Sequence, residues 1–396
     1  MFADTDLLAP DPILGLSKLF ADDQRPTKID LGVGVFRTKE GVTPIMKAVA
    51  EGEKRVTEKQ ASKVYTPADG APGFGDAIMT LALGADHEAM KSGRSAAVQA
   101  PGGCGALRLA GELLTRVGAS KIVIGAPTWP NHKPLLTAAG ATIEMVPYYD
   151  AAASVVLFDQ FKDAVSKLGP SDVLLLHGAC HNPSGADLSH EQIDEIIAIA
   201  AERGFLVLID SAYHGFAADL ETDAYIIRAA AERLPEVLVT YSCSKNFGLY
   251  RERTGALIII GEDRDRAAAV KSHALNIARA NYSMPPAHGG AIVAEILGSP
   301  DLAGAWREEL AAMAERVRAN RKLLVEAASA HGLGNRLSYI ASQNGMFSLL
   351  PTTVEQVTAM REKHGVYAVG AGRINLCGVH EDNVETLVSA VADVLS

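Results

Sequence analysis

The chain has 396 residues, enough for two domains, and its formal net charge of −10 leaves no basic surplus with which to bind nucleic-acid phosphates. Hydrophobic residues make up 48% of it and charged residues 21%, which is the balance of a soluble globular protein. Because no apolar run approaches the roughly 20 residues that span a bilayer, we expect neither a membrane nor a nucleic acid as a partner.

The N-terminus and the cysteines suggest a compartment. The opening stretch MFADTDLLAPDPILGL contains aspartates but no basic residue ahead of an apolar run, unlike a secretory signal peptide. The four cysteines are far apart and form no C-x-x-C pair, which favours a reducing compartment. We therefore expect a cytoplasmic protein.

The pattern of residues along the chain predicts an α/β fold. From about residue 97 to 261, short β-rich runs alternate with helical patterns, one of which starts with the capping-box spacing of Ser189 and Gln192. The runs are apolar on both faces, which favours a mostly parallel sheet sandwiched by helices. The predicted strands are SAAVQA, KIVIGAPT, ATIEMVPYY, DVLLLHGA, FLVLID, VLVTYSCS and GALIIIG.

A second, smaller α+β domain is expected at the C-terminus. An Ala-, Glu- and Arg-rich segment from Pro300 to about His331 predicts one long connecting helix. Short strands, GMFSLL and GRINLCG, and a final helix near NVETLVSAVADVL follow it. We therefore expect an N-terminal segment (1–45) packed on the small domain, a large domain (46–310) and the small domain itself (311–396).

Ligands of open α/β sheets bind at the carboxyl ends of the strands, so the residues after each strand are the ones to inspect. After SAAVQA, the stretch PGGCGALRLAGELL puts Gly102, Gly103 and Gly105 ahead of a helix, where free backbone N–H groups favour an anion. The stretch has neither the Gly-Lys-Ser/Thr of a Walker A loop nor the G-x-G-x-x-G spacing. A turn that only lets helix and strand pack is an equal alternative.

Polar and aromatic side chains follow three further strands. Trp129 could fill a core or stack on a planar ligand. His177 and His181 lie four residues apart on a strand end and a loop, and without a third ligand we expect no metal there. Asp210 follows the apolar run FLVLI, so it is either the N-cap of the next helix or a buried carboxylate that faces a cation.

Lys245 ends the apolar run VLVTYSCS, where burial of a free ammonium group would be costly. A phosphate loop, a stacking ring, a buried carboxylate and a lysine are together the parts that hold pyridoxal 5′-phosphate. The lysine amine bonds to the cofactor aldehyde and later serves as a base. The carboxylate keeps the pyridine nitrogen protonated, so that the ring accepts electrons.

The stretches SCSKNFGLYRERTGA, HNPSG, DSAYHGF, PTWPNH, ARANYSMPPAHG and AGRIN resemble the class I aminotransferases, specifically the aspartate and aromatic amino-acid aminotransferase group. The resemblance covers essentially the whole chain, from LGVGVF at residue 31 to GVYAVGAGRINLCG. It implies the PLP-dependent transferase fold type I and an obligate homodimer in which two chains build each site. It also implies ping-pong transfer of an amino group from aromatic amino acids or aspartate to 2-oxoglutarate.

The resemblance implies catalytic roles for matching positions. Lys245 would carry the covalent link and move the proton, and Asp210 would pair with the pyridinium, with His132 behind it. Asn182 and Tyr213 would hydrogen-bond the phenolic oxygen of the cofactor. The ring would stack on Trp129, and the phosphate would lie among Gly103, Cys104, Ser242, Arg253 and the partner subunit's Tyr65.

Substrate contacts are implied in the same way. Arg373 would grip the α-carboxylate, for which the planar fork of arginine is suited. Arg279 would reach from the other subunit to the distal carboxylate. Gly34 would lie on the N-terminal segment that closes over the substrate. Trp129 and Asn182 would also contact the substrate.

Four positions depart from the usual pattern. Cys104 stands where a hydroxyl residue is usual, so one phosphate hydrogen bond is weakened or lost. Met284 and Val64 replace residues that are polar in aspartate-restricted relatives, and Phe36 replaces a tyrosine. We expect these changes to make the pocket entrance more apolar.

Other functions remain open at this point. A strict aspartate aminotransferase would differ only in substrate, whereas a lyase or decarboxylase would use the same fold for another reaction. Arg279 and Arg373 favour transamination, because two carboxylate grips suit dicarboxylates. A non-catalytic regulator would need a fused DNA-binding region, and the chain has no basic segment for one.

Overall fold

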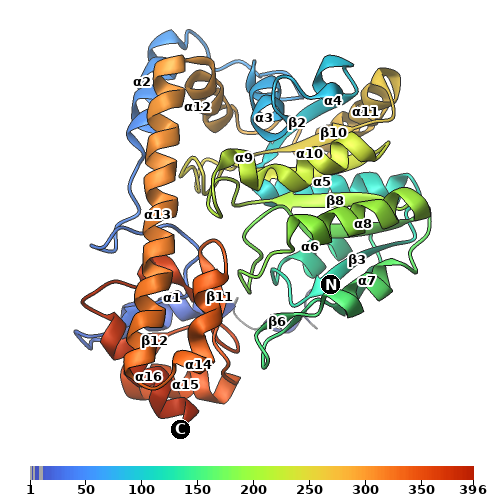
Figure 1. The fold of residues 1–396 in the computed structure, drawn as a ribbon. Helices are drawn as coiled ribbons and strands as arrows, with labels where there is room; N and C mark the ends of the chain where they lie inside the picture. Colours follow the sequence, from blue (N-terminus) through green and yellow to red (C-terminus); the bar gives the residue numbers. More distant parts are fainter. Residues whose placement is uncertain (1, 3–4, 9–11) are drawn as a thin grey trace.

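The computed structural model describes residues 2, 5–8 and 12–396, and its main feature is a seven-stranded sheet in the order β2-β10-β9-β8-β7-β3-β4 (Figure 1). All neighbouring strands are parallel except that β10 is antiparallel to both β2 and β9. The strands are β2 (Ser95–Pro101), β3 (Lys121–Ala126), β4 (Ile143–Pro147), β7 (Asp172–His177), β8 (Leu206–Ser211), β9 (Val237–Ser242) and β10 (Thr254–Ile260).

The predicted alternation of strands and helices breaks down at the last pair. Between β9 and β10, residues 243–253 form turns and no helix, so the chain reverses directly and β10 runs antiparallel. A parallel neighbour would have needed a crossover helix. The loop between these strands carries Lys245.

Helices cover both faces of the sheet. Successive strand residues point to opposite sides, and both sides carry apolar residues that need to be buried. In β8, for example, Leu208 belongs to the core beneath α5 and α11, whereas Val207 and Ile209 belong to the core on the other face. The helices of the large sheet are α3 (Phe74–Leu83), α4 (Glu88–Lys91), α5 (Gly102–Arg116), α6 (His132–Ala138), α7 (Phe158–Val165), α8 (His190–Arg203), α9 (Leu220–Asp223), α10 (Tyr225–Arg233) and α11 (Arg264–Asn281).

The predicted long helix is confirmed as α13 (Pro300–Ala330), which runs from the helices beside the sheet down to the C-terminal region (Figure 1). The capping box of α8 is confirmed as well, with Ser189 and Gln192 bonded reciprocally. Beside the upper part of α13 lie α2 (Lys47–Lys59) and α12 (Ala287–Gly298).

The C-terminal region contains short strands and helices around the lower part of α13. Residues of the N-terminal segment join it, because β1 pairs in parallel with β12 through Ile29 and Val366. The elements are α1 (Pro12–Asp22), β1 (Ile29–Asp30), α14 (Gly334–Leu337), β11 (Phe347–Leu349), α15 (Val354–His364), β12 (Val366–Tyr367), β13 (Arg373–Asn375) and α16 (Val384–Leu395), with 3₁₀ turns at Ser338–Ser342 and Leu376–Gly378. A small ribbon, β5 (Tyr149–Asp150) and β6 (Val155–Val156), follows β4.

Among the described residues, no helix is long and apolar enough to cross a membrane.

Candidate functional site

A cavity of about 250 Å³ lies where the carboxyl ends of the sheet strands meet β11 and β13. It brings together residues that are far apart in the sequence but that were each predicted from a strand end or a motif. The predicted site residues that line it are Gly34, Gly103, Cys104, Trp129, Asn182, Asp210, Tyr213, Ser242, Lys245, Arg253 and Arg373.

Lys245 lies in this cavity on the loop that follows β9, with its amine 4.8 Å from the centroid of the Tyr213 ring. Burial lowers the pKa of the amine below its usual value, while the negative charge of Asp210 acts against that shift. A lysine with a lowered pKa reaches its neutral, nucleophilic form more readily. The position therefore suits an amine that forms a covalent bond and exchanges a proton.

Asp210 is a buried carboxylate and not a helix cap. Its Oδ2 lies 3.0 Å from His132 Nε2, and its Oδ1 accepts a hydrogen bond of 2.9 Å from the Thr240 hydroxyl. Burial alone raises the pKa of Asp210, but the hydrogen bond and electrostatic influence of His132, together with the weaker effect of the Thr240 hydrogen bond, outweigh it and the pKa is lowered. The site thus holds a fixed negative charge against which a cation can be placed.

A hydrogen-bonded chain extends behind this carboxylate. The Thr128 hydroxyl lies 2.8 Å from His132 Nδ1 and 3.0 Å from His177 Nε2. His132 contacts Asp210 through Nε2 and Thr128 through Nδ1, and the Thr128 hydroxyl also contacts His177, so these groups form one connected chain. Burial lowers the pKa of His177 to about 3, so that ring is neutral near neutral pH.

Asn182 and Tyr213 lie together on the loops after β7 and β8. The Asn182 amide donates to the Tyr213 hydroxyl over 3.4 Å, and both residues are buried. Burial raises the pKa of Tyr213 above its usual value, so the phenol keeps its proton. Both side chains thus offer hydrogen-bond donors to a ligand oxygen.

The predicted anion loop is the first turn of α5, since the helix begins at Gly102 itself and not after the glycines. Gly102 has a φ of +70°, and a Cβ there would lie 2.6 Å from Nη2 of Arg253. A Cβ on Gly103 would lie 3.1 Å from the Cβ of Ser242. Arg253 is itself in the left-handed region, with φ 52°, a strained geometry of the kind found at ligand sites. The turn, the hydroxyl and the guanidinium form a cradle for an anion.

Arg373 enters the cavity from β13. Its Nη2 donates to the carbonyl oxygen of Gly32 over 2.9 Å, and its guanidinium stacks 4.5 Å from the centre of the Phe347 ring. These contacts hold the planar fork in place. Gly34 belongs to the same N-terminal segment, and a Cβ there would approach Phe347 to 3.2 Å.

Three predicted residues do not line this cavity: His132, which lies behind Asp210 as expected, and Tyr65 and Arg279. Tyr65 is 86% exposed, and with Arg279 it lines a separate open hollow of about 450 Å³ that also includes Met284. The Arg279 guanidinium donates to the hydroxyl of Ser283 over 2.8 Å. Phe36 also differs from expectation, because it is buried in the core and does not line the cavity.

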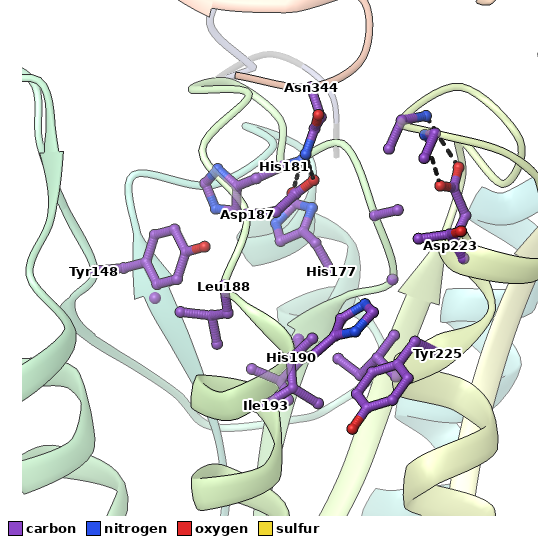
Figure 2. A pocket seen from close by; sticks show the side chains of 18 of the residues that line it. Tyr148, His177, His181, Asp187, Leu188, His190, Ile193, Asp223, Tyr225 and Asn344 are labelled. Carbon is purple, nitrogen blue, oxygen red and sulfur yellow. Dashed lines mark hydrogen bonds between the residues drawn. The ribbon is translucent and has the colours of Figure 1, made fainter. Parts of the chain in front are cut away.

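A second cavity, of about 140 Å³, shares His177 with the first (Figure 2). Its two acidic side chains are already paired with the protein. Asp187 accepts from the Asn344 amide at 3.0 Å, and Asp223 accepts from the backbone N–H groups of residues 215, 217 and 218. None of the unpartnered buried side-chain atoms of the described residues lies on its lining. The acidic side chains therefore hold the surrounding loops in place, and this cavity is a weaker candidate for a ligand site.

Several residues of the site were not predicted. Thr128 is the last residue of the predicted strand KIVIGAPT, so its position at a strand end was a usable signal. Phe347 reaches the cavity from a distant segment, and no local pattern marks it. Tyr250, in contrast, belongs to the stretch SCSKNFGLYRERTGA that carries Lys245 and could have been found from it. The unpredicted lining residues are Leu107, His177, Ala212, Ser244, Tyr250 and Phe347.

The cavity fits the cofactor and substrate that the resemblance implies. Oδ1 of Asn182 and Nε of Arg373 are buried without a hydrogen-bond partner, although these residues are only 4% and 5% exposed. Buried polar atoms normally have partners, so both atoms point to a ligand with polar groups. The anion cradle, the fixed carboxylate and the buried amine match phosphate, pyridinium and aldehyde respectively.

Comparison with known proteins agrees with this geometry. The family model for aminotransferase class I and II matches residues 26–391. The chain is 41% identical to an aspartate aminotransferase of Haemophilus influenzae over 396 residues, 100% of both chains. It is 41% identical to an aromatic-amino-acid aminotransferase of Pseudomonas aeruginosa, over 99% of this chain and 98% of that protein. The crystal structure of a Burkholderia pseudomallei aromatic-amino-acid aminotransferase, covalently bound to pyridoxal phosphate, matches with a TM-score of 0.97 and 40% identity over 100% of both chains.

Proposed function

This chain belongs to the aminotransferase class I and II family, and from that premise we propose that it transfers amino groups from aspartate and aromatic amino acids to 2-oxoglutarate, using pyridoxal phosphate. The observation that carries the proposal is the single cavity in which Lys245, Asp210 and Arg373 converge. The transfer is a ping-pong reaction, in which the donor leaves as its oxo acid before the acceptor binds.

Each group has a part in this reaction. Pyridoxal phosphate, when bound, supplies an aldehyde and an electron-accepting ring. Lys245 provides the amine that bonds to it and then moves the proton at the substrate α-carbon. Asp210 keeps a positive charge on the ring nitrogen, and the cradle of Gly103, Ser242 and Arg253 anchors the phosphate. Cys104 and Trp129 complete the cofactor contacts.

The substrate is held by its carboxylates. Arg373, with its unpartnered Nε, binds the α-carboxylate in the cavity. Asn182 and Tyr213 orient the cofactor oxygen beside it, and Gly34 carries the N-terminal segment over the substrate. Arg279 and Arg373 together favour transamination over a lyase or decarboxylase reaction, because two carboxylate-binding arginines suit dicarboxylate substrates.

We also propose that the active protein is a homodimer with shared sites. Tyr65 and Val64 are 86% and 74% exposed, and Arg279 is exposed beside Tyr65. Large apolar side chains around an exposed guanidinium are typical of a surface that another chain covers. In the dimer, Tyr65 would join the partner's phosphate cradle and Arg279 would bind the distal carboxylate.

The cytoplasm is the proposed location, supported by four cysteines that are all free. The proposed division into an N-terminal segment (1–45), a large domain (46–310) and a small domain (311–396) is supported by the pairing of β1 with β12. The connecting helix α13 spans the second boundary.

The experiment that tests the function compares aspartate, tyrosine and phenylalanine as donors with 2-oxoglutarate as acceptor at steady state. We expect turnover with aspartate and with at least one aromatic donor. Turnover with aspartate alone would support a strict aspartate aminotransferase, and Val64 and Met284 would then carry no information about the substrate. Release of ammonia or carbon dioxide without conversion of 2-oxoglutarate to glutamate would support a lyase or decarboxylase.

Replacement of Arg279 by leucine should separate the two substrate classes. Loss of a charged hydrogen-bonded pair costs about 2–5 kcal/mol, so kcat/KM for aspartate should fall by roughly 30- to 5000-fold. For phenylalanine, kcat/KM should be nearly unchanged or improved. A neutral ring packed against the Arg279 guanidinium would leave that cation buried without a partner, so phenylalanine loses nothing when the guanidinium is removed. The matched control is Arg108→Leu, which removes a partly exposed arginine that pairs with Glu112 on α5 and should leave kcat/KM for both donors near the wild-type value. Equal losses for both donors would make Arg279 structural.

Mixed dimers test the sharing of sites. An Arg279→Ala chain and a Lys245→Ala chain should each be inactive with aspartate, but a hybrid dimer combines both defects in one site and leaves the other intact. Because about half of randomly mixed dimers are hybrids, with one good site each, about a quarter of wild-type activity should return. Hybrid dimers isolated with two different tags that show no activity would put both residues of one chain in the same site.

A further inference from the structure

Cys104 differs from the other three cysteines in its surroundings. Cys180, Cys243 and Cys377 are buried in the core, at most 2% exposed, and burial raises the pKa of each thiol. Cys104 is partly exposed and lines the cavity that contains Lys245. It is therefore the one cysteine of the four that a dissolved reagent can reach without unfolding of the chain.

A helix N-terminus and basic side chains surround Cys104. The residue lies in the first turn of α5, a helix of 15 residues whose positive end faces the cavity. The basic side chains of Lys245, Arg253 and Arg373 line the same cavity. Burial lowers the pKa of the Lys245 amine, and both Asp210 and Cys104 act electrostatically on it, so the amine and the Cys104 sulfur are near enough to interact. A helix N-terminus and basic groups are the surroundings in which reactive cysteines are found.

The cavity around this thiol is built to receive a ligand. Oδ1 of Asn182 and Nε of Arg373 line it without a hydrogen-bond partner, and both residues are at least nine-tenths buried. The glycines beside Cys104 leave room for an anion, because a Cβ on Gly102 would collide with Arg253. An anion in this cradle would occupy the space from which a reagent must approach the sulfur.

We propose that Cys104 is a site of thiol–disulfide exchange that competes with binding of a phosphate-bearing cofactor, an inference that rests on the proposed function. A hydroxyl group would contact a phosphate here but could not be oxidised in this way. The cysteine binds phosphate more weakly and adds a reactive centre. Cofactor retention is then sensitive to the thiol–disulfide balance of the surroundings.

The modifying co-reactant is a small-molecule disulfide. The Cys104 thiol loses its proton to solvent, and the thiolate sulfur attacks one sulfur of the S–S bond of the reagent. A new S–S bond joins Cys104 to one half of the reagent, and the other half leaves as a thiolate. The Cys104 sulfur is oxidised and the leaving sulfur is reduced, so the electrons balance. An added thiol reverses the reaction.

The first experiment measures the rate at which full-length protein, freed of cofactor, reacts with 5,5′-dithiobis(2-nitrobenzoate). We expect one fast-reacting thiol per chain, identified as Cys104 by mass spectrometry and absent from Cys104→Ser, in which the three buried cysteines serve as the internal control. Inorganic phosphate or pyridoxal phosphate at about ten times its Kd should slow the fast phase about tenfold, by mass action. A fast phase that persists in Cys104→Ser, or that ignores both anions, would overturn the proposal.

The second experiment measures the Kd of pyridoxal phosphate by its visible absorption before and after treatment with the reagent. The treated wild-type protein should bind the cofactor at least about tenfold more weakly and recover with dithiothreitol, whereas Cys104→Ser and Cys104→Ala should be unaffected by the treatment. Untreated Cys104→Ser should bind more tightly than Cys104→Ala. An unchanged Kd after complete modification would contradict the proposal. If untreated wild-type protein failed to bind the cofactor, the proposed function would fail instead, and the phosphate measurement would still decide the role of Cys104.

Discussion

Lys245→Ala is expected to lower turnover by roughly 10⁴-fold or more, because it removes the residue that we propose both bonds to the cofactor and moves the proton. The variant should also lose the link to pyridoxal phosphate that borohydride makes permanent in the wild type. Steady-state turnover and the mass of the borohydride-treated chain measure the two losses.

The matched control is Lys162→Ala. Lys162 is a lysine on α7 that pairs with Glu195 over 3.1 Å and does not line the cavity. It should keep wild-type turnover and the borohydride-fixed link, and thermal unfolding should show both variants folded. If Lys245→Ala turned over at the wild-type rate, another amine would have to serve the cofactor and the assignment of Lys245 would be wrong.

Asp210→Ala is expected to lose most of the rate, by roughly 10²–10³-fold, since a fixed charge that stabilises the reacting system is removed from a buried site. Asp210→Glu should retain part of the rate, because the carboxylate survives at a shifted position. Since the hydrogen bonds of the folded site lower the pKa of Asp210, the carboxylate stays ionised at neutral pH. Its contribution to stability is lost only as the pH falls through that lowered value.

Asp223→Asn controls for the burial of the charge. Asp223 is as buried as Asp210, each 6% exposed, but its oxygens accept backbone N–H groups of the loop after β8 and it lies outside the Lys245 cavity. We expect it to lower the melting temperature while kcat of the folded fraction stays near the wild-type value. Equal and mild effects of Asp210→Ala and Asp210→Glu on kcat would mean that Asp210 does not act on the cofactor.

The sequence by itself determined the elements and the candidates at their ends. The strand runs and the long helix α13 were read from the pattern of side chains along the chain, and the capping box of α8 from the spacing of two residues. Both signals depend only on residues that are close together in the sequence. Asp210 and Lys245 could be singled out because a charged residue at the end of an apolar strand needs a reason. The motifs around them were enough to indicate the family.

Only the tertiary structure decided which groups act together. The state of Asp210 depends on His132, 78 residues away, and the setting of Arg373 depends on the carbonyl of Gly32, 341 residues away. Such contacts arise from strand order and register, to which local periodicity is blind. For the same reason, the sequence did not predict that Phe347 lines the cavity or that Phe36 lies in the core. It also did not predict that Tyr65 and Arg279 lie together in a separate exposed hollow.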